Sequence, residues 1–207
     1  MDEWLARVTD LMDTDFRKEV QKKIEEFRSF RNKGPEEIFN ELCFCILTAN
    51  TSAELGISMQ KSISSSQFLN LEKIQLRDAL KDSRYRFYNT RSSYIAANRW
   101  IASELPLLLN HPDHWFSREF LVENLKGIGY KEASHFLRNC GVFDFAILDK
   151  HIIRMVSGIS GEIDKPLNRW RYYSMEKKLS NIASELSVDP GILDLYMWKL
   201  ATGKLIK

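Results

Sequence analysis

A lysine and an aspartate stand near two glycines, in a pattern that suits covalent catalysis. The stretch LKGIGYKEASHFLRN, residues 125–139, places Lys131 directly after a two-glycine turn, and Asp149 follows 18 positions later. A lysine amine can attack an electrophilic carbon and form a Schiff base. A carboxylate nearby can stabilise the positive charge that develops there. The pair is therefore compatible with nucleophilic catalysis, in which Lys131 would be the nucleophile and Asp149 its acidic partner.

Each of the two residues also has a simpler structural explanation. A lysine near a helix start is usually solvated. An aspartate directly before KHIIRMV is by itself more often an N-cap than a catalyst. The two roles of Asp149 are compatible, because capping holds the carboxylate in place and leaves one oxygen free. The local evidence at each position favours the structural role.

The turn before Lys131 contains two glycines, Gly127 and Gly129, on either side of one apolar residue. Glycine tolerates positive φ angles and leaves the backbone N–H groups uncovered. Such a turn before a helix N-terminus can hold a phosphate, because free N–H groups and the helix dipole both favour an anion. An ordinary helix–helix turn is the default for this pattern alone. The apolar neighbours Leu125, Ile128 and Ala133 favour a helix-hairpin-helix.

The segment LKGIGYKEASHFLRNCGVFDFAILDKHI resembles the helix-hairpin-helix and Gly/Pro-loop-Asp motif of DNA glycosylases. Three other segments, ELCFCILTANTSAE, RYRFYNTRSSYI and WKLATGKLIK, are similar to the archaeal-type 8-oxoguanine DNA glycosylase/AP lyases. The resemblance implies that Lys131 is the catalytic lysine and Asp149 the catalytic aspartate, in preference to their structural explanations. One departure from the family pattern is the loop NCGVFDFAILD, which keeps Gly141 but has no proline.

The resemblance implies a monomeric, bifunctional enzyme of DNA base-excision repair. It would bind damaged double-stranded DNA, flip out and excise 8-oxoguanine through a lysine Schiff base, and cleave the abasic strand by β-elimination. Two alternatives stay open: a glycosylase of the same fold for another damaged base, and a non-catalytic helix-hairpin-helix module that grips DNA. Lys131 argues against the module, because a hairpin that only grips phosphates needs no nucleophile.

Three residues are candidates for contacts near the flipped base. Trp198 is a candidate for stacking on the base, with a core tryptophan as the alternative. His151 is interpreted as a DNA-backbone or structural histidine. Lys207 matches the C-terminal lysine that the family uses to distinguish 8-oxoguanine from guanine, and a frayed, solvated tail is the alternative. The lesion has an N–H donor at N7, so a well-placed acceptor, such as the terminal carboxylate of Lys207, would recognise it.

A basic and aromatic segment, RYRFYNTR, is a second candidate for DNA contacts. Arg84 and Arg86 alternate there with aromatic side chains that include Phe87, a combination that can meet phosphates and unstacked bases. From Lys81 to Arg99 the chain holds five basic residues and one acidic residue. A helix start with buried aromatic residues is an equally good explanation for any one of these rings.

The elements that must position these residues are helices, because apolar residues recur at helical spacing almost throughout the chain. We expect an all-α fold with two closely joined lobes, since no long polar linker separates them. The resemblance adds a helix-hairpin-helix motif and an active-site cleft between the lobes. The whole chain, 1–207, would form one helix-hairpin-helix glycosylase unit. Its approximate lobes would be residues 1–80 with 160–207, and residues 81–159.

Prolines and glycines mark the ends of the two most apolar helices. One helix is expected to begin at Pro35, in GPEEIFNELCFCILTAN, and another at Pro190, with Asp189 as a possible cap and Gly203 as its end. Shorter helices are expected around residues 53–63, 71–81, 89–105, 113–124, 131–140 and 150–157.

Composition limits cofactors and location. The chain has 207 residues, a formal net charge of +2 and three cysteines, which show neither a disulfide framework nor a CxxC metal spacing. No cysteine follows Cys140, so the four-cysteine iron–sulfur cluster of some relatives is excluded by count. We expect no cofactor and no metal site. The start of the chain has no apolar signal region, and no apolar run is long enough to span a bilayer, which indicates a cytoplasmic protein without membrane association.

Overall fold

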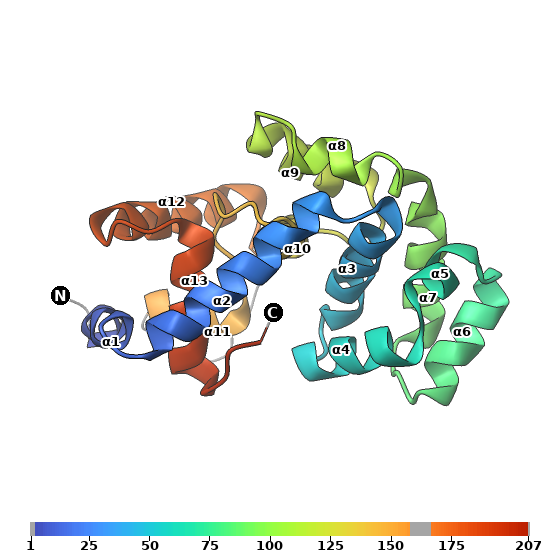
Figure 1. Ribbon diagram of the computed structural model, residues 1–207, viewed down its shortest axis with the longest axis horizontal. Coiled ribbons are helices and arrows are strands. Elements are labelled where there is room, and N and C mark those ends of the chain that lie inside the picture. The colour runs from blue at the N-terminus through green and yellow to red at the C-terminus, as the bar shows by residue number, and fades with distance from the viewer. Residues whose placement is uncertain (1–2, 158–166, 207) are drawn as a thin grey trace.

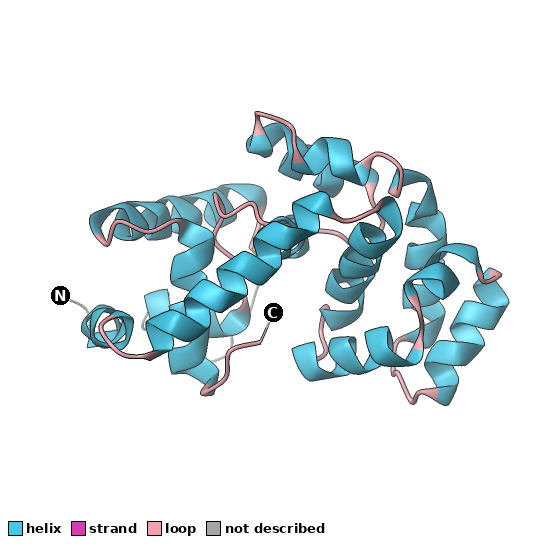
Figure 2. Ribbon diagram, viewed as in Figure 1, coloured by secondary structure: helices cyan, strands magenta, loops and turns pink. Residues whose placement is uncertain are grey.

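A computed structural model describes residues 3–157 and 167–206, and every regular element within them is helical (Figure 2). The all-α prediction is confirmed, and the helices form two closely joined lobes (Figure 1). In chain order the elements are α1 (Glu3–Met12), α2 (Phe16–Ser29), the 3₁₀ turn η1 (Phe30–Asn32), α3 (Pro35–Thr48), α4 (Ala53–Ser62), α5 (Ser65–Asn70), α6 (Lys73–Asp82), α7 (Tyr88–Asn98), the 3₁₀ turn η2 (Arg99–Ile101), α8 (Leu105–Leu109), α9 (His114–Asn124), α10 (Tyr130–Asn139), α11 (Lys150–Ser157), α12 (Arg169–Glu185) and α13 (Pro190–Thr202).

Helix α3 is the centre of the first lobe. Every residue from Leu42 to Leu47 is fully buried, because this stretch is apolar on all sides of the helix and needs neighbours all round. Helices α4, α5, α7, α8 and α10 supply these neighbours. The turn between α6 and α7 packs on the same helix, since the Tyr85 hydroxyl donates to the Leu47 carbonyl oxygen at 2.6 Å.

The second lobe is built from the two ends of the chain. The apolar stripe Phe16, Val20, Ile24 and Phe27 on α2 is buried in a core to which α13 also contributes. The ring of Tyr196 on α13 meets Phe16 edge to face, with centroids 5.8 Å apart. Helices α1, α2, α11 and α12 all pack against α13.

The two hydrophobic cores group the helices differently from the lobes expected from the sequence. Core residues of the first lobe lie between positions 38 and 145, and those of the second lie at 8–27 and 143–197. Helices α3 to α6 therefore belong with α7 to α10, and α11 belongs with the terminal helices. The physical reason is that α3 is apolar on all sides, so the helices that follow it in the chain pack around it. Helix α2 leads from the second lobe into α3 (Figure 1).

Two helix boundaries differ from the sequence prediction. The helix expected over 89–105 is interrupted: α7 ends at Asn98, η2 follows, and α8 begins at Leu105. The backbone of Asn98, with φ −96° and ψ 0°, departs there from regular helix, and its side chain exchanges two hydrogen bonds with the Lys126 backbone. Helix α5 was not predicted. It is opened by Ser64 and Gln67, each of which bonds to the backbone of the other.

The expected ends of the last helix are confirmed. Helix α13 begins at Pro190 and stops before Gly203, which has a φ of +74°. Asp189 stands at the N-cap, where its side chain makes no capping hydrogen bond within the described residues. In the ranges 3–157 and 167–206, no helix is long and apolar enough to cross a bilayer.

Candidate active site

A cavity of about 660 Å³ lies where the two lobes meet. Its walls come from the α3–α4 junction, from α10 and α13, and from the segment that enters α11. The tail after α13 runs toward α4 at this place (Figure 1). The volume is in the range of small-molecule sites. The residues that line it are Thr48, Asn50, Thr51, Ser52, Ala53, Glu54, Lys131, Glu132, His135, Arg138, Ile147, Leu148, Asp149, Lys150, His151, Asp194, Trp198, Thr202, Lys204 and Ile206.

The hairpin before α10 needs glycine at one of its two glycine positions. Gly127 has a φ of +76°, and a Cβ there would lie 2.3 Å from the ring of Tyr94. Gly129 has a φ of −105° and is extended, so positive φ occurs at the first glycine and not at both. Gly129 is the N-cap of α10: its carbonyl accepts from the Ala133 N–H at 2.9 Å, and its own N–H donates to Glu132 at 3.3 Å.

A buried asparagine attaches the hairpin to α7. The N–H of Lys126 donates to Asn98 Oδ1, and Asn98 Nδ2 donates to the Lys126 carbonyl, both at 2.9 Å. Asn98 is only 1% exposed. The two bonds hold the turn so that α10 begins at a defined place. No local signal in the sequence pointed to Asn98, because its partner is 28 residues away.

Lys131 is the second residue of α10 and lines the cavity. Its side chain is 26% exposed, and Nζ lies 3.8 Å from Glu132 Oε1. The amine is therefore accessible from the cavity. The turn defined by Gly127 and Asn98 sets its position, since the helix that carries it starts directly after that turn.

Asp149 lies in the same cavity and also caps a helix. Its Oδ1 accepts from the N–H groups of His151 at 2.7 Å and Ile152 at 2.9 Å, at the start of α11. Asp149 is therefore the N-cap of α11 through Oδ1, and its second carboxylate oxygen takes no part in the cap. The preceding loop is packed rather than solvated: Gly141 has a φ of +84°, and a Cβ there would lie 2.9 Å from the backbone of Arg28. This packing holds the loop in place without the proline that the family pattern has.

Two of the candidates for base contacts also line the cavity. The rings of His151 and Trp198 meet edge to face, with centroids 5.4 Å apart. Trp198 Nε1 is buried and has no hydrogen-bond partner among the described residues. Lys207 lies outside the described residues, although Lys204 and Ile206 before it line the cavity.

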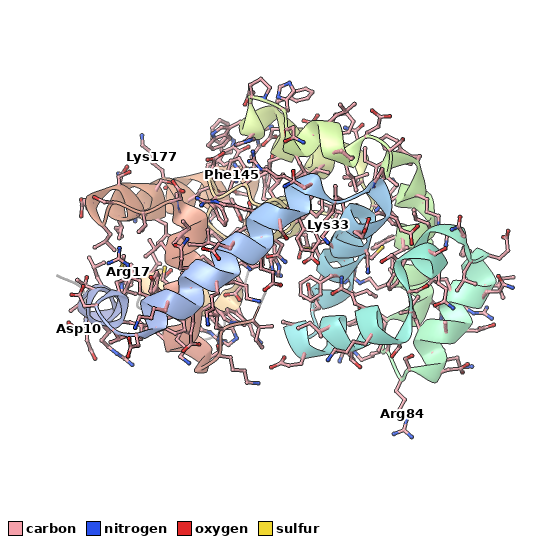
Figure 3. All side chains as sticks on the ribbon, in the orientation of Figure 1. Asp10, Arg17, Lys33, Arg84, Phe145 and Lys177 are labelled. Atoms are coloured by element: carbon pink, nitrogen blue, oxygen red, sulfur yellow. The ribbon has the colours of Figure 1, made fainter. Side chains whose placement is uncertain are left out.

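The basic and aromatic segment lies apart from the cavity lining. Arg84 has a φ of +58° and extends into solvent from the α6–α7 turn (Figure 3). The guanidinium of Arg86 lies 4.3 Å from the centroid of the half-buried Phe87 ring. Tyr85 is buried in the core, and Arg91 donates to the Ala49 carbonyl at 2.9 Å. The turn is thus fastened to the end of α3 that leads into the cavity wall.

Sequence reasoning missed a buried ion pair that lines the cavity. Arg138 Nη1 on α10 donates to Asp194 Oδ2 on α13 at 2.9 Å. Burial raises the pKa of Asp194 to about 7, although the positive charge of Arg138 acts in the opposite direction. Burial also lowers the pKa of Arg138. A polar residue inside an otherwise apolar helix was the available signal, but its partner is 56 positions away.

Within 3–157 and 167–206, no group of three or more His, Cys, Asp or Glu side chains is arranged to hold a metal ion. Cys43, Cys45 and Cys140 are buried thiols without a disulfide.

Known proteins match the chain over almost its whole length. A family model described as 8-oxoguanine DNA glycosylase matches residues 20–188. The 8-oxoguanine DNA glycosylase/AP lyase of Thermoplasma acidophilum is 48% identical over 203 residues, which cover 98% of each chain. The protein of the same description from Methanocaldococcus jannaschii is 44% identical and covers 98% of this chain and 99% of its own.

Solved structures match equally well. The crystal structure of the M. jannaschii 8-oxoguanine glycosylase/lyase in complex with 15mer DNA containing 8-oxoguanine has a TM-score of 0.92 at 44% identity, over 98% of this chain and 99% of that one. The 8-oxoguanine DNA glycosylase of Thermotoga maritima has a TM-score of 0.91 at 41% identity, over 99% of both chains. The resemblance found in the sequence is confirmed, and the chain belongs to the 8-oxoguanine DNA glycosylase family.

Proposed function

We propose that this protein excises 8-oxoguanine from damaged double-stranded DNA and then cleaves the abasic strand, as a bifunctional glycosylase and AP lyase. The observation that carries the proposal is the shared cavity. Lys131 and Asp149 both line one cavity between the lobes, in a chain that belongs to this family. A cavity at a lobe junction suits a base that has left the duplex, because the two walls can enclose it.

Lys131 acts as the nucleophile in the proposed reaction. Its neutral amine forms a bond to C1′ of the sugar while the glycosidic bond breaks, and the base leaves with the electron pair and accepts a proton. The adduct opens to a Schiff base, which makes the C2′ proton acidic. Loss of this proton expels the 3′ phosphate by β-elimination, and water then releases the enzyme. Asp149 stabilises the positive charge of the oxocarbenium-like sugar during the first step.

The residues around the pair supply the contacts to DNA. Trp198 stacks on the flipped base, and His151, next to it, contacts the backbone. Gly127 and Gly129 bind a phosphate at the hairpin, because two residues without side chains let it approach the backbone closely in front of the α10 dipole. Arg84, Arg86 and Phe87 reach the DNA from the α6–α7 turn, since this turn is bonded to the end of α3 beside the cavity.

We further infer that the protein acts as a monomer and in the cytoplasm. Both lobes that line the cavity belong to one chain. The relatives come from archaea and bacteria, whose DNA is cytoplasmic.

The direct test is a panel of duplexes that differ in one base: 8-oxoguanine, guanine, an alkylated purine and an oxidised pyrimidine. We expect excision and borohydride-trapped covalent complex on the 8-oxoguanine duplex, and neither on guanine. If the covalent complex formed preferentially on the oxidised-pyrimidine duplex, the result would support the alternative of a glycosylase for another damaged base. Binding to all four duplexes without any excision would indicate the non-catalytic module.

Deleting Lys207 should lower excision of 8-oxoguanine far more than nicking at a preformed abasic site. The proposal assigns Lys207 to base recognition, which the abasic substrate does not need, and its neighbours Lys204 and Ile206 line the cavity. A site built around an acceptor for the N7–H of the lesion rejects a base without that donor by roughly 10⁴-fold, so loss of this contact should have a large effect on excision. Single-turnover rates on the two duplexes measure the difference. Equal loss on both substrates would exclude a role for Lys207 in reading the base.

A further inference from the structure

The buried Arg138–Asp194 ion pair connects the helix of the nucleophile to the helix of the base-stacking tryptophan. The two side chains are 3% and 7% exposed, and their donor and acceptor are 2.9 Å apart. Arg138 lies seven residues after Lys131 on α10, and Asp194 lies four residues before Trp198 on α13. At these spacings each partner shares a helix face with the functional residue, two turns and one turn away. All four residues line the cavity.

The two helices belong to different hydrophobic cores. Ala133, Phe136 and Leu137 of α10 are buried in the core of the first lobe, and α10 packs mainly against α3 and α9. Leu193 and Met197 of α13 are buried in the second core, and α13 packs against α1, α2, α11 and α12. Apolar packing within each lobe does not by itself set the distance between α10 and α13. The ion pair crosses from one lobe to the other at this point.

Arg138 is itself fixed by further contacts with both lobes. Its Nε donates to Asn139 Oδ1 at 3.0 Å, and Asn139 Nδ2 donates to Glu41 Oε1 on α3 at 2.7 Å. Its guanidinium carbon lies 5.1 Å from the ring centroid of Phe27. A Cβ on Gly191, at the start of α13, would lie 3.1 Å from Arg138 Cγ. Arg138 is therefore held in a defined position, and its ion pair with Asp194 ties α13 to that position.

On the basis of the proposed function, we propose that Arg138 and Asp194 are positioning residues that hold the base-stacking side of α13 in register with the nucleophile on α10. Excision needs both sides at once, because the base must rest against Trp198 while C1′ lies within reach of Lys131. Cleavage at a preformed abasic site needs only the α10 side. The ion pair therefore matters more for the first reaction than for the second.

The experiment measures single-turnover excision on an 8-oxoguanine duplex and single-turnover nicking on a matched abasic duplex, for wild type and Asp194→Ala. We expect excision to fall by roughly 10²-fold, the scale of a misplacement of about 1 Å at a reacting centre, and nicking by about threefold or less. Wild-type protein that performs neither reaction would refute the proposed function itself. The positioning role would be refuted if the wild-type protein performs both reactions and the Asp194→Ala protein loses them equally or not at all.

Another buried ion pair serves as a matched control. Arg118 on α9 bonds Glu176 on α12 at 2.5 and 2.9 Å, with side chains 0% and 3% exposed, and it too joins the first core to the second. Neither residue lines the cavity. Glu176→Ala should lower the melting temperature about as much as Asp194→Ala does, and keep the wild-type ratio of excision to nicking. The same shift of the ratio in both variants would mean that any buried inter-lobe contact suffices.

If Asp194→Ala does not fold, Asp194→Asn provides the same test. The amide keeps the shape of the side chain and can still accept a hydrogen bond from Arg138, but the charge attraction is lost. Excision should then fall by roughly tenfold, with nicking again less affected, and the loss should appear in the rate constant at saturating enzyme. The proposal would be overturned if a folded Asp194→Asn protein kept both the wild-type ratio of excision to nicking and the wild-type rate constant for excision.

Discussion

Lys131→Gln should abolish the covalent complex with 8-oxoguanine DNA that borohydride traps in the wild-type protein. The substitution removes the amine that forms the Schiff base and keeps a side chain of similar length at the second position of α10. Without a nucleophile the reaction has no covalent path, so excision should fall by roughly 10³-fold or more. Gel analysis of trapped complexes and single-turnover rates give the two measurements, and DNA binding by the variant should persist.

Lys150→Gln is the matched control for this prediction. Lys150 also lines the cavity and is exposed, so its substitution removes the same charge from the same place but leaves the nucleophile. A contact between a lysine and a phosphate is worth about tenfold or less in affinity, and we expect Lys150→Gln to stay within that limit. A Lys131→Gln protein that still forms the trapped complex would remove Lys131 from the mechanism.

Asp149→Asn should lower excision by roughly 10²-fold while the melting temperature changes little. The asparagine can still accept the N–H groups of His151 and Ile152, so the cap of α11 survives. What disappears is the negative charge that the oxocarbenium-like state needs. Asp149→Ala should lose both functions, with a decrease of about 1 kcal/mol in the free energy of unfolding from the missing cap.

Asp113 provides a control for capping without catalysis. It is the N-cap of α9, where its side chain accepts from the Phe116 N–H at 3.1 Å, and it does not line the cavity. Asp113→Ala should cost a similar amount of stability and leave excision at the wild-type rate. If Asp149→Asn were as active as wild type and Asp149→Ala were merely unstable, like Asp113→Ala, the carboxylate would be only a helix cap.

The ends of α13, the hairpin and the place of Lys131 at the start of α10 could be predicted from the sequence because each depends on neighbours in the chain. Pro190 and Gly203 delimit α13 through their own φ preferences, and Gly127 permits a turn that other residues resist. The hairpin segment that holds Lys131 and Asp149, together with three further segments, was also sufficient to recognise the family. Local conformational preference and motif spacing carry this information without any knowledge of the packing.

Only the tertiary structure decided which distant groups meet. Tyr85 is one of the aromatic residues of RYRFYNTR for which a DNA contact and a buried ring were equally good explanations; it is buried, and its hydroxyl donates to the Leu47 carbonyl, 38 residues away. The attachment of the hairpin to Asn98, the ion pair of Arg138 with Asp194 and the grouping of α3 with the later helices have the same origin. Such contacts form when helices from separate parts of the chain bury their apolar faces together. The polar residues on these faces then pair with whichever partner lies next to them in the fold. The spacing of residues along the chain does not reveal these partners.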